Sequence, residues 1–105
     1  MTNAPAPMHF KDGRLYITRE TCDRHFPGLA TVILLRQDDD LLVLPVRHAA
    51  SGGYVLKLRN AAGDRVVSAA DFFRDQGIGD DATWEGRFAW CAEHGGIRAY
   101  AFFAM

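Results

Sequence analysis

The sequence predicts a mostly β fold of the α+β class, in which two similar halves clasp about a pseudo-twofold axis and build one barrel with two short helices. The main observation is an internal repeat, because the segment 13–22 recurs in kind as the segment 64–72. In each copy a turn leads into a short β-branched or aromatic run, and a hydroxyl residue, Thr18 or Ser68, then opens a helical segment. The second observation is size, because one half of this chain is too small to bury an adequate core alone.

Composition fits one compact domain. The chain has 105 residues, of which 49% are hydrophobic and 24% are charged. Residues 1–8 are rich in Ala and Pro and lack the features of a signal peptide, so we expect a disordered tail followed by a single domain over 9–105. No apolar run approaches the ~20 residues of a membrane span, and two Cys make no disulfide framework. A cytoplasmic protein without a membrane partner is therefore expected.

The first half, 9–46, is expected to form a hairpin, a short helix and a second hairpin. Thr18 suits the N-cap of the helix, with Glu20 in the first turn, where the helix dipole favours an anion. Pro27 and Gly28 end the helix. The second hairpin is made of continuous apolar runs, which predict burial on both faces. The expected elements are strands 8–10 and 14–17, a helix 18–26, and strands 30–36 and 41–46.

The second half, 54–103, repeats this order after a link of small residues. Tyr54, Leu56 and Leu58 are expected to share one face of its first strand. Ser68 opens a capping-box-like segment, and Gly77 suits the first position after the helix. The expected elements are strands 54–58 and 65–67, a helix 68–76, and strands 83–91 and 97–103.

The repeated segments also resemble a known family. The run from Gly13 to Glu20 looks like the Gly-Arg-apolar-Pro-x-Glu start of AbrB/MraZ-type swapped-hairpin domains, and the segment 64–74 is similar, with Gly77-Ile78 closing the helix as in that family. The resemblance covers most of 9–46 and 54–103. It implies a pseudo-twofold swapped-hairpin barrel with both halves in one chain, as in the MraZ type. Because members are mostly DNA-binding regulators, it also implies a small DNA-binding regulatory protein.

Charge along the chain indicates where such a protein would meet DNA. The net charge is only −1, so DNA binding must rest on a local patch. Segments 9–24 and 54–65 carry net charges of +1 and +2, whereas segment 71–81 carries −3. We therefore expect the two equivalent hairpins to contact phosphates or bases, while the alternative is that their cations only guard strand edges. The candidate residues are Lys11, Arg14, Lys57, Arg59 and Arg65.

A second candidate site is a zinc site. The pattern Cys-x-x-His occurs twice, as Cys22 with His25 and as Cys91 with His94. Two thiolates and two imidazoles form a legitimate tetrahedral zinc set, and zinc is the one cofactor that the sequence suggests. The alternative is a small apolar Cys beside a surface His in each case.

Another class of function is a protein-interaction or accessory module on the same barrel. Its surface would be the last hairpin, where aromatic residues crowd, together with the acidic segment 71–81. An enzyme is not expected, because the sequence has no phosphate-binding Gly-rich loop and no nucleophile elbow.

Overall fold

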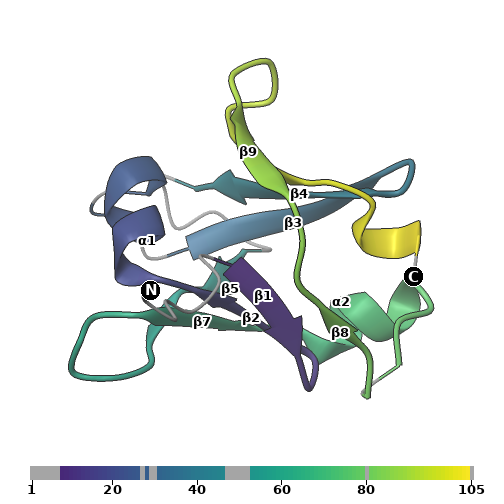
Figure 1. The fold of residues 1–105 in the computed structure, drawn as a ribbon, viewed down its shortest axis with the longest axis horizontal. Coiled ribbons are helices and arrows are strands. Elements are labelled where there is room, and N and C mark those ends of the chain that lie inside the picture. Colours follow the sequence, from purple (N-terminus) through teal and green to yellow (C-terminus); the bar gives the residue numbers. More distant parts are fainter. Residues whose placement is uncertain (1–7, 27, 29–30, 47–52, 80, 105) are drawn as a thin grey trace, which may run out of the picture.

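The computed structural model describes residues 8–26, 28, 31–46, 53–79 and 81–104. Over these residues the fold is mostly β, with two antiparallel sheets and two α-helices, which confirms the predicted class (Figure 1). In chain order the elements are β1 (Met8–Lys11), β2 (Arg14–Ile17), α1 (Arg19–His25), β3 (Thr31–Gln37), β4 (Asp40–Pro45), β5 (Tyr54–Val55), β6 (Lys57–Leu58), β7 (Arg65–Ser68), α2 (Ala70–Asp75), β8 (Thr83–Trp84), β9 (Phe88–Cys91), β10 (Gly96–Ala99) and the 3-10 helix η1 (Phe102–Ala104).

Strand order in the two sheets follows the division into halves. Sheet A has the order β6-β7-β2-β1-β8 and sheet B the order β5-β3-β4-β10-β9. The central pair of each sheet, β2–β7 or β4–β10, joins a strand of the first half to the corresponding strand of the second half. The pairs β1–β8 and β3–β5 also join the two halves, and each takes the place of the other when the halves are exchanged. Over the described residues no closed barrel is found, so the single barrel stays a prediction.

Two expected strands each divide between the sheets. The segment 54–58 enters sheet B as β5, turns at the buried Leu56 and continues in sheet A as β6. The segment 83–91 likewise supplies β8 to sheet A and β9 to sheet B. The expectation that Tyr54, Leu56 and Leu58 share one face of a single strand was wrong, because the chain changes sheets at the buried Leu56 and Leu58 beyond it is 66% exposed.

The remaining expected boundaries are close to those observed, with local exceptions. Met8 is the first described residue and is fully buried in β1, whereas residues 1–7 of the expected tail lie outside the described part. The hairpin β3–β4 is not buried on both faces, because Leu35 is 45% exposed. The last expected strand ends at Ala99, where the chain turns into η1.

The two helices differ at their N-termini. Thr18 caps α1 as predicted, because its side chain accepts a hydrogen bond from the backbone N–H of Thr21. The predicted cap of α2 was wrong: Ser68 is the last residue of β7, and Ala69 stands at the N-cap without a side-chain hydrogen bond. At the other end of α2, Gly77 follows the helix as predicted, with a φ of 82°.

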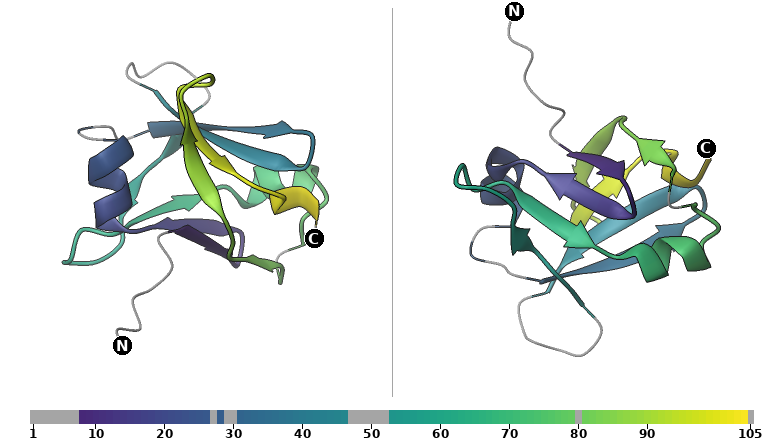
Figure 2. Two further views of the ribbon diagram at one scale, coloured as in Figure 1. Left: turned by 45° about the horizontal axis from the view of Figure 1, so that its top comes forward. Right: turned by 90° about the horizontal axis from the view of Figure 1, so that it is seen from below.

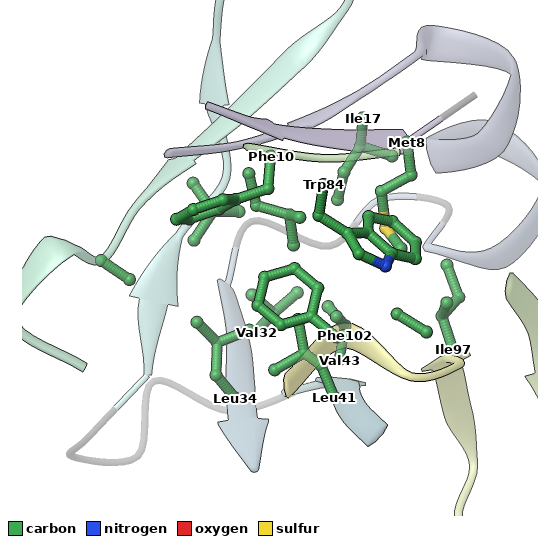
Figure 3. Packing of buried hydrophobic residues seen from close by; sticks show 14 of the residues in the cluster. Met8, Phe10, Ile17, Val32, Leu34, Leu41, Val43, Trp84, Ile97 and Phe102 are labelled. Atoms are coloured by element: carbon green, nitrogen blue, oxygen red, sulfur yellow. The ribbon is translucent and has the colours of Figure 1, made fainter. Parts of the chain in front are cut away.

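The core lies between the two sheets (Figures 2 and 3). Phe102 of η1 is fully buried at its centre, and its ring centroid lies 5.3 Å from those of both Phe10 and Trp84. The helices close opposite ends of this core, α1 through Cys22 and Phe26 and α2 through Phe73, whose ring packs on Phe10 at 4.6 Å (Figure 2). Sheet A therefore has one face on the core and one face turned outward.

Candidate nucleic-acid interface

The outward face of sheet A follows from strand register. Phe10, Leu15 and Val67 lie opposite one another in β1, β2 and β7 and are buried. Because side chains alternate along a strand, their neighbours in sequence point away from the core. We call this surface the basic face, and its members from both halves of the chain are His9, Lys11, Arg14, Tyr16, Lys57 and Arg59.

The turn between β1 and β2 sets this register. Asp12 and Gly13 have φ angles of 54° and 73°, which a two-residue turn of type I′ requires. Lys11 and Arg14 are therefore paired directly across the hairpin, and His9 lies opposite Tyr16. The two cations come from the same short turn region, beside an aromatic pair.

A stacked row crosses the basic face. The rings of His9 and Tyr16 are nearly parallel, with an interplanar angle of 13° and centroids 4.8 Å apart. The guanidinium carbon of Arg59 lies 4.6 Å from the centre of the Tyr16 ring, a cation–π distance. Since β1 and the β6–β7 hairpin lie on opposite sides of β2, His9 and Arg59 cover opposite faces of Tyr16.

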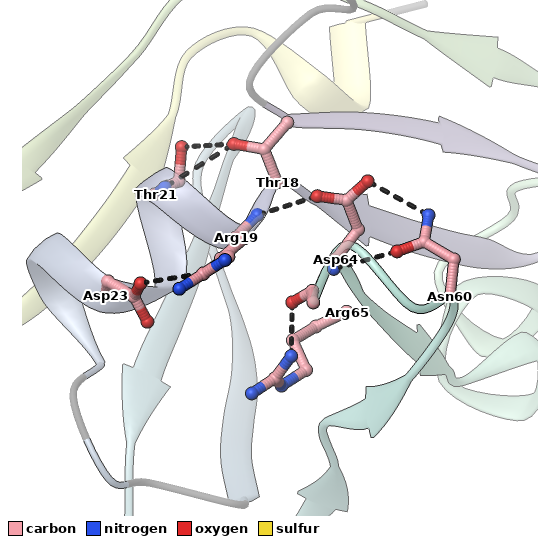
Figure 4. A network of polar contacts seen from close by, with 8 residues as sticks. Thr18, Arg19, Thr21, Asp23, Asn60, Asp64 and Arg65 are labelled. Carbon is pink, nitrogen blue, oxygen red and sulfur yellow. Dashed lines mark hydrogen bonds and ion pairs between the residues drawn. The ribbon is translucent and has the colours of Figure 1, made fainter.

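A polar network joins the turn that follows Arg59 to the start of α1 (Figure 4). The backbone N–H of Arg59 donates to the carbonyl of Asp64 at 2.7 Å, which closes the turn between β6 and β7. Asp64 accepts hydrogen bonds from the Asn60 side chain at 3.0 Å and from the Arg19 backbone N–H at 2.9 Å. These two bonds hold the pKa of the Asp64 carboxyl below its ordinary value. The turn that carries Arg59 is thus tied to the first turn of α1.

Partial burial lowers the pKa of His9, and the charges of Arg59 and Lys11 act in the same direction. Glu85 opposes this shift. A neutral imidazole at neutral pH follows from the lowered pKa. His9 therefore contributes an aromatic surface to the basic face rather than a further charge.

A hollow of about 200 Å³ opens beside His9. It lies at the β1–β8 edge of sheet A and is lined by His9, Phe10, Lys11, Thr83, Trp84 and Glu85. Thr83 is paired with Lys11 across this edge, and both are exposed. The hollow therefore continues the basic face past the end of the stacked row.

Four of the five predicted DNA-binding residues share this face, and Arg65 does not. Arg65 is paired with the buried Ile17, so its side chain leaves β7 on the opposite side of the sheet from Tyr16. It is half-buried there and donates a hydrogen bond to the carbonyl of Gly63. The sequence did not single out His9 and Tyr16, although the alternation along 8–11 and 14–17 would have placed both beside the predicted cations.

The predicted zinc ligands separate into two groups. Cys91, Glu93 and His94 gather at the tip of the β9–β10 hairpin, with one ligand atom of each within 4.8 Å of the others. Cys22 is buried in the core, and burial raises the pKa of its thiol to about 11. His25 stacks on Trp90 with ring centroids 5.1 Å apart. Among the described residues, the only group of three or more such side chains that could hold a metal ion therefore contains neither Cys22 nor His25.

No protein-family model matches the chain, and neither a curated protein nor a solved structure matches it. In the part of the chain that the structure describes, every helix is too short or too polar to cross a membrane.

Proposed function

We propose that this protein binds DNA through the basic face of sheet A and acts as a small regulatory protein. The observation that supports it is the gathering of four cations from both halves of the chain around a stacked aromatic pair. Cations neutralise phosphates and set the position of the nucleic acid, while aromatic rings offer surfaces to bases. The four cations are Lys11, Arg14, Lys57 and Arg59.

The family relationship belongs to the same proposal. A swapped-hairpin barrel of the AbrB/MraZ type would place its two equivalent N-terminal hairpins side by side, as β1–β2 and β6–β7 lie in sheet A. Each central pair, β2–β7 and β4–β10, joins corresponding strands of the two halves, which supports this interpretation. It gives a reason for cations of both halves to share one face.

Salt-dependent binding tests the proposal. We expect a fluorescein-labelled duplex of random sequence to bind in fluorescence anisotropy, with an affinity that falls steeply as salt rises. The double variant Arg14→Ala, Lys57→Ala should weaken binding and reduce the log–log salt slope by about two, since each phosphate contact contributes about 0.9. No binding to duplex or single-stranded DNA at low salt would overturn the proposal.

Arg36 provides a matched control for these variants. Its guanidinium lies 4.7 Å from the centre of the Phe103 ring, so it resembles Arg59 in charge and setting but belongs to sheet B. Arg36→Ala removes one positive charge without touching the basic face, and we expect the affinity and salt slope to stay close to those of the wild type. An equal loss in Arg36→Ala would mean that overall charge rather than the basic face drives binding.

A second candidate function is a protein-interaction module on the last hairpin. Trp90 of β9 is 40% exposed and lies against His25, and a large exposed aromatic residue is a typical anchor for a partner. This function would leave the basic face unused. If DNA binding fails, a pull-down that compares the wild type with Trp90→Ala is the experiment that tests it.

A further inference from the structure

We propose that the hollow beside His9 receives an unpaired nucleobase, so that the basic face selects single-stranded over duplex DNA. This inference rests on the proposed function and names the form of DNA that the same face takes. It depends on the stacked row and on the hollow, which lies where the row ends.

The stacked row ends at His9, next to the hollow. Tyr16 is covered by His9 on one face and by Arg59 on the other, so it has no face left for a base. His9 stacks on Tyr16 toward β2, and it also lines the hollow, which lies at the β1–β8 edge on the side of β1 away from β2. A base that enters the hollow would therefore extend the row by one member and stack on His9, whose imidazole is backed by Tyr16.

The size and lining of the hollow fit one base and its phosphate. Its volume of about 200 Å³ is below the range of about 300–1,000 Å³ that is typical for drug-sized ligands. Glu85 offers a carboxylate that can accept a hydrogen bond from an exocyclic amino group of the kind cytosine carries. Lys11 stands at the same hollow and can meet the adjacent phosphate.

Duplex DNA cannot use this hollow. Bases within a duplex have both faces covered by their neighbours, so stacking on His9 requires a base that has left the stack. Phosphates, in contrast, are available in both forms of DNA. The four cations should therefore bind either form, and the hollow should add affinity only for the single strand.

Three fluorescein-labelled probes separate the two contributions in anisotropy measurements at low salt. The first is an oligodeoxycytidine strand of about 12 nucleotides, within the usual site size of single-strand binders. The second is an abasic strand with the same number of phosphates, and the third is a duplex of the same length. We expect the base-bearing strand to bind at least about 5-fold more tightly than the abasic strand, as one stacked base would provide.

Variants of His9 assign this difference to the hollow. His9→Ala removes the stacking surface and should bring the two single strands to nearly equal affinity, whereas His9→Phe keeps an aromatic face and should retain the preference. Arg36→Ala, on the other sheet, should also retain it. Equal binding of both single strands by the wild type, or an unchanged preference in His9→Ala, would overturn the inference while leaving DNA binding by the cations intact. Failure of all three probes would instead overturn the proposed function.

A spectroscopic measurement tests the hollow without altering it. The sequence has two Trp, and Trp90→Phe leaves Trp84, which lines the hollow, as the only indole. We expect its fluorescence to change when the base-bearing strand is added and to stay constant with the abasic strand at equal saturation. Identical responses to both strands would place the base elsewhere and contradict the inference.

Discussion

The backbone N–H of Arg19 donates a hydrogen bond to Asp64 Oδ1 at 2.9 Å, so a carboxylate of the second half satisfies the first turn of the helix in the first half. Thr18 satisfies the N–H of Thr21 in the same turn, and the two acceptors therefore serve different donors. A negative charge at this position is also favoured by the helix dipole. The start of α1 thus depends on residues from both halves.

The Asp64 carboxylate should make the fold less stable at acidic pH. Its pKa is lowered in the folded protein by the hydrogen bonds from Asn60 and Arg19, so its contribution is complete above the ordinary carboxyl pKa of 3.8 and is lost as pH falls through the lower folded value. We expect Asp64→Asn to have a lower urea midpoint than the wild type at neutral pH, and this difference to shrink as the pH is lowered below 3.8. The exposed Asp81→Asn is the control. A difference between Asp64→Asn and the wild type that stays constant as the pH is lowered would contradict this account.

The buried Cys22 thiol should make the fold less stable at alkaline pH. Burial raises the pKa of its thiol from 9.0 to about 11, so between these values the unfolded chain loses the proton and the folded chain keeps it. Stability from this group therefore falls as pH rises through that window. We expect the free energy of unfolding to fall less steeply with rising pH in Cys22→Ala than in the wild type. Parallel pH profiles would show that the thiol does not stay protonated in the fold. Tyr54, whose pKa is also raised, is present in both proteins and does not affect the comparison.

The cluster of possible ligands at the tip of the β9–β10 hairpin predicts which cysteine would bind a metal ion. Cys91 lies with Glu93 and His94, whereas Cys22 lies in the core. In a cobalt titration we expect thiolate-to-metal absorption to disappear in Cys91→Ser and in His94→Ala and to persist in Cys22→Ala. Loss of the absorption in Cys22→Ala would support the four-ligand set that the sequence suggested. Absence of the absorption in the wild type would mean that the three groups hold no cobalt.

Phe102 should be the most sensitive aromatic residue of the core. It is fully buried and its ring packs on Phe10, Phe73 and Trp84. We expect Phe102→Ala to lower the free energy of unfolding by about 3–5 kcal/mol, because the cavity that it leaves cannot be refilled from η1. Its neighbour Phe103 is only half-buried, and Phe103→Ala should cost clearly less. Denaturant unfolding measures both, and equal losses would contradict the central position of Phe102.

Local signals predicted most elements, and they were wrong where the chain changes sheets. Thr18 and Gly77 mark helix ends, and each forms a hydrogen bond with a residue only three positions away. A short sequence pattern is therefore enough to predict them. Leu58 was misplaced because alternation assumes one continuous strand, whereas the bend at Leu56 resets the pattern. Ser68 was misplaced because pairing with Arg14 in β2 keeps it in the sheet instead of at the cap.

The candidate site was predicted in part for the same reason. Lys11 and Arg14 are joined by a two-residue turn, so their proximity follows from local sequence. The position of Arg59 over Tyr16 depends on pairing between halves, and no local pattern contains it. Arg65 was expected with the other cations because charge was counted along segments, but in β7 it lies on the face that carries Ile17.

The position of β10 has a consequence for how this protein is made. Ile97 and Ala99 of β10 pair with Val43 and Leu41 of β4, in the middle of sheet B. During synthesis, β4 and the apolar face of the first half stay exposed until β10 has left the ribosome. Strand pairings that span so much of the sequence also form slowly. We therefore expect the yield of this protein in cells to respond to translation speed and temperature more than the stability of the folded state suggests.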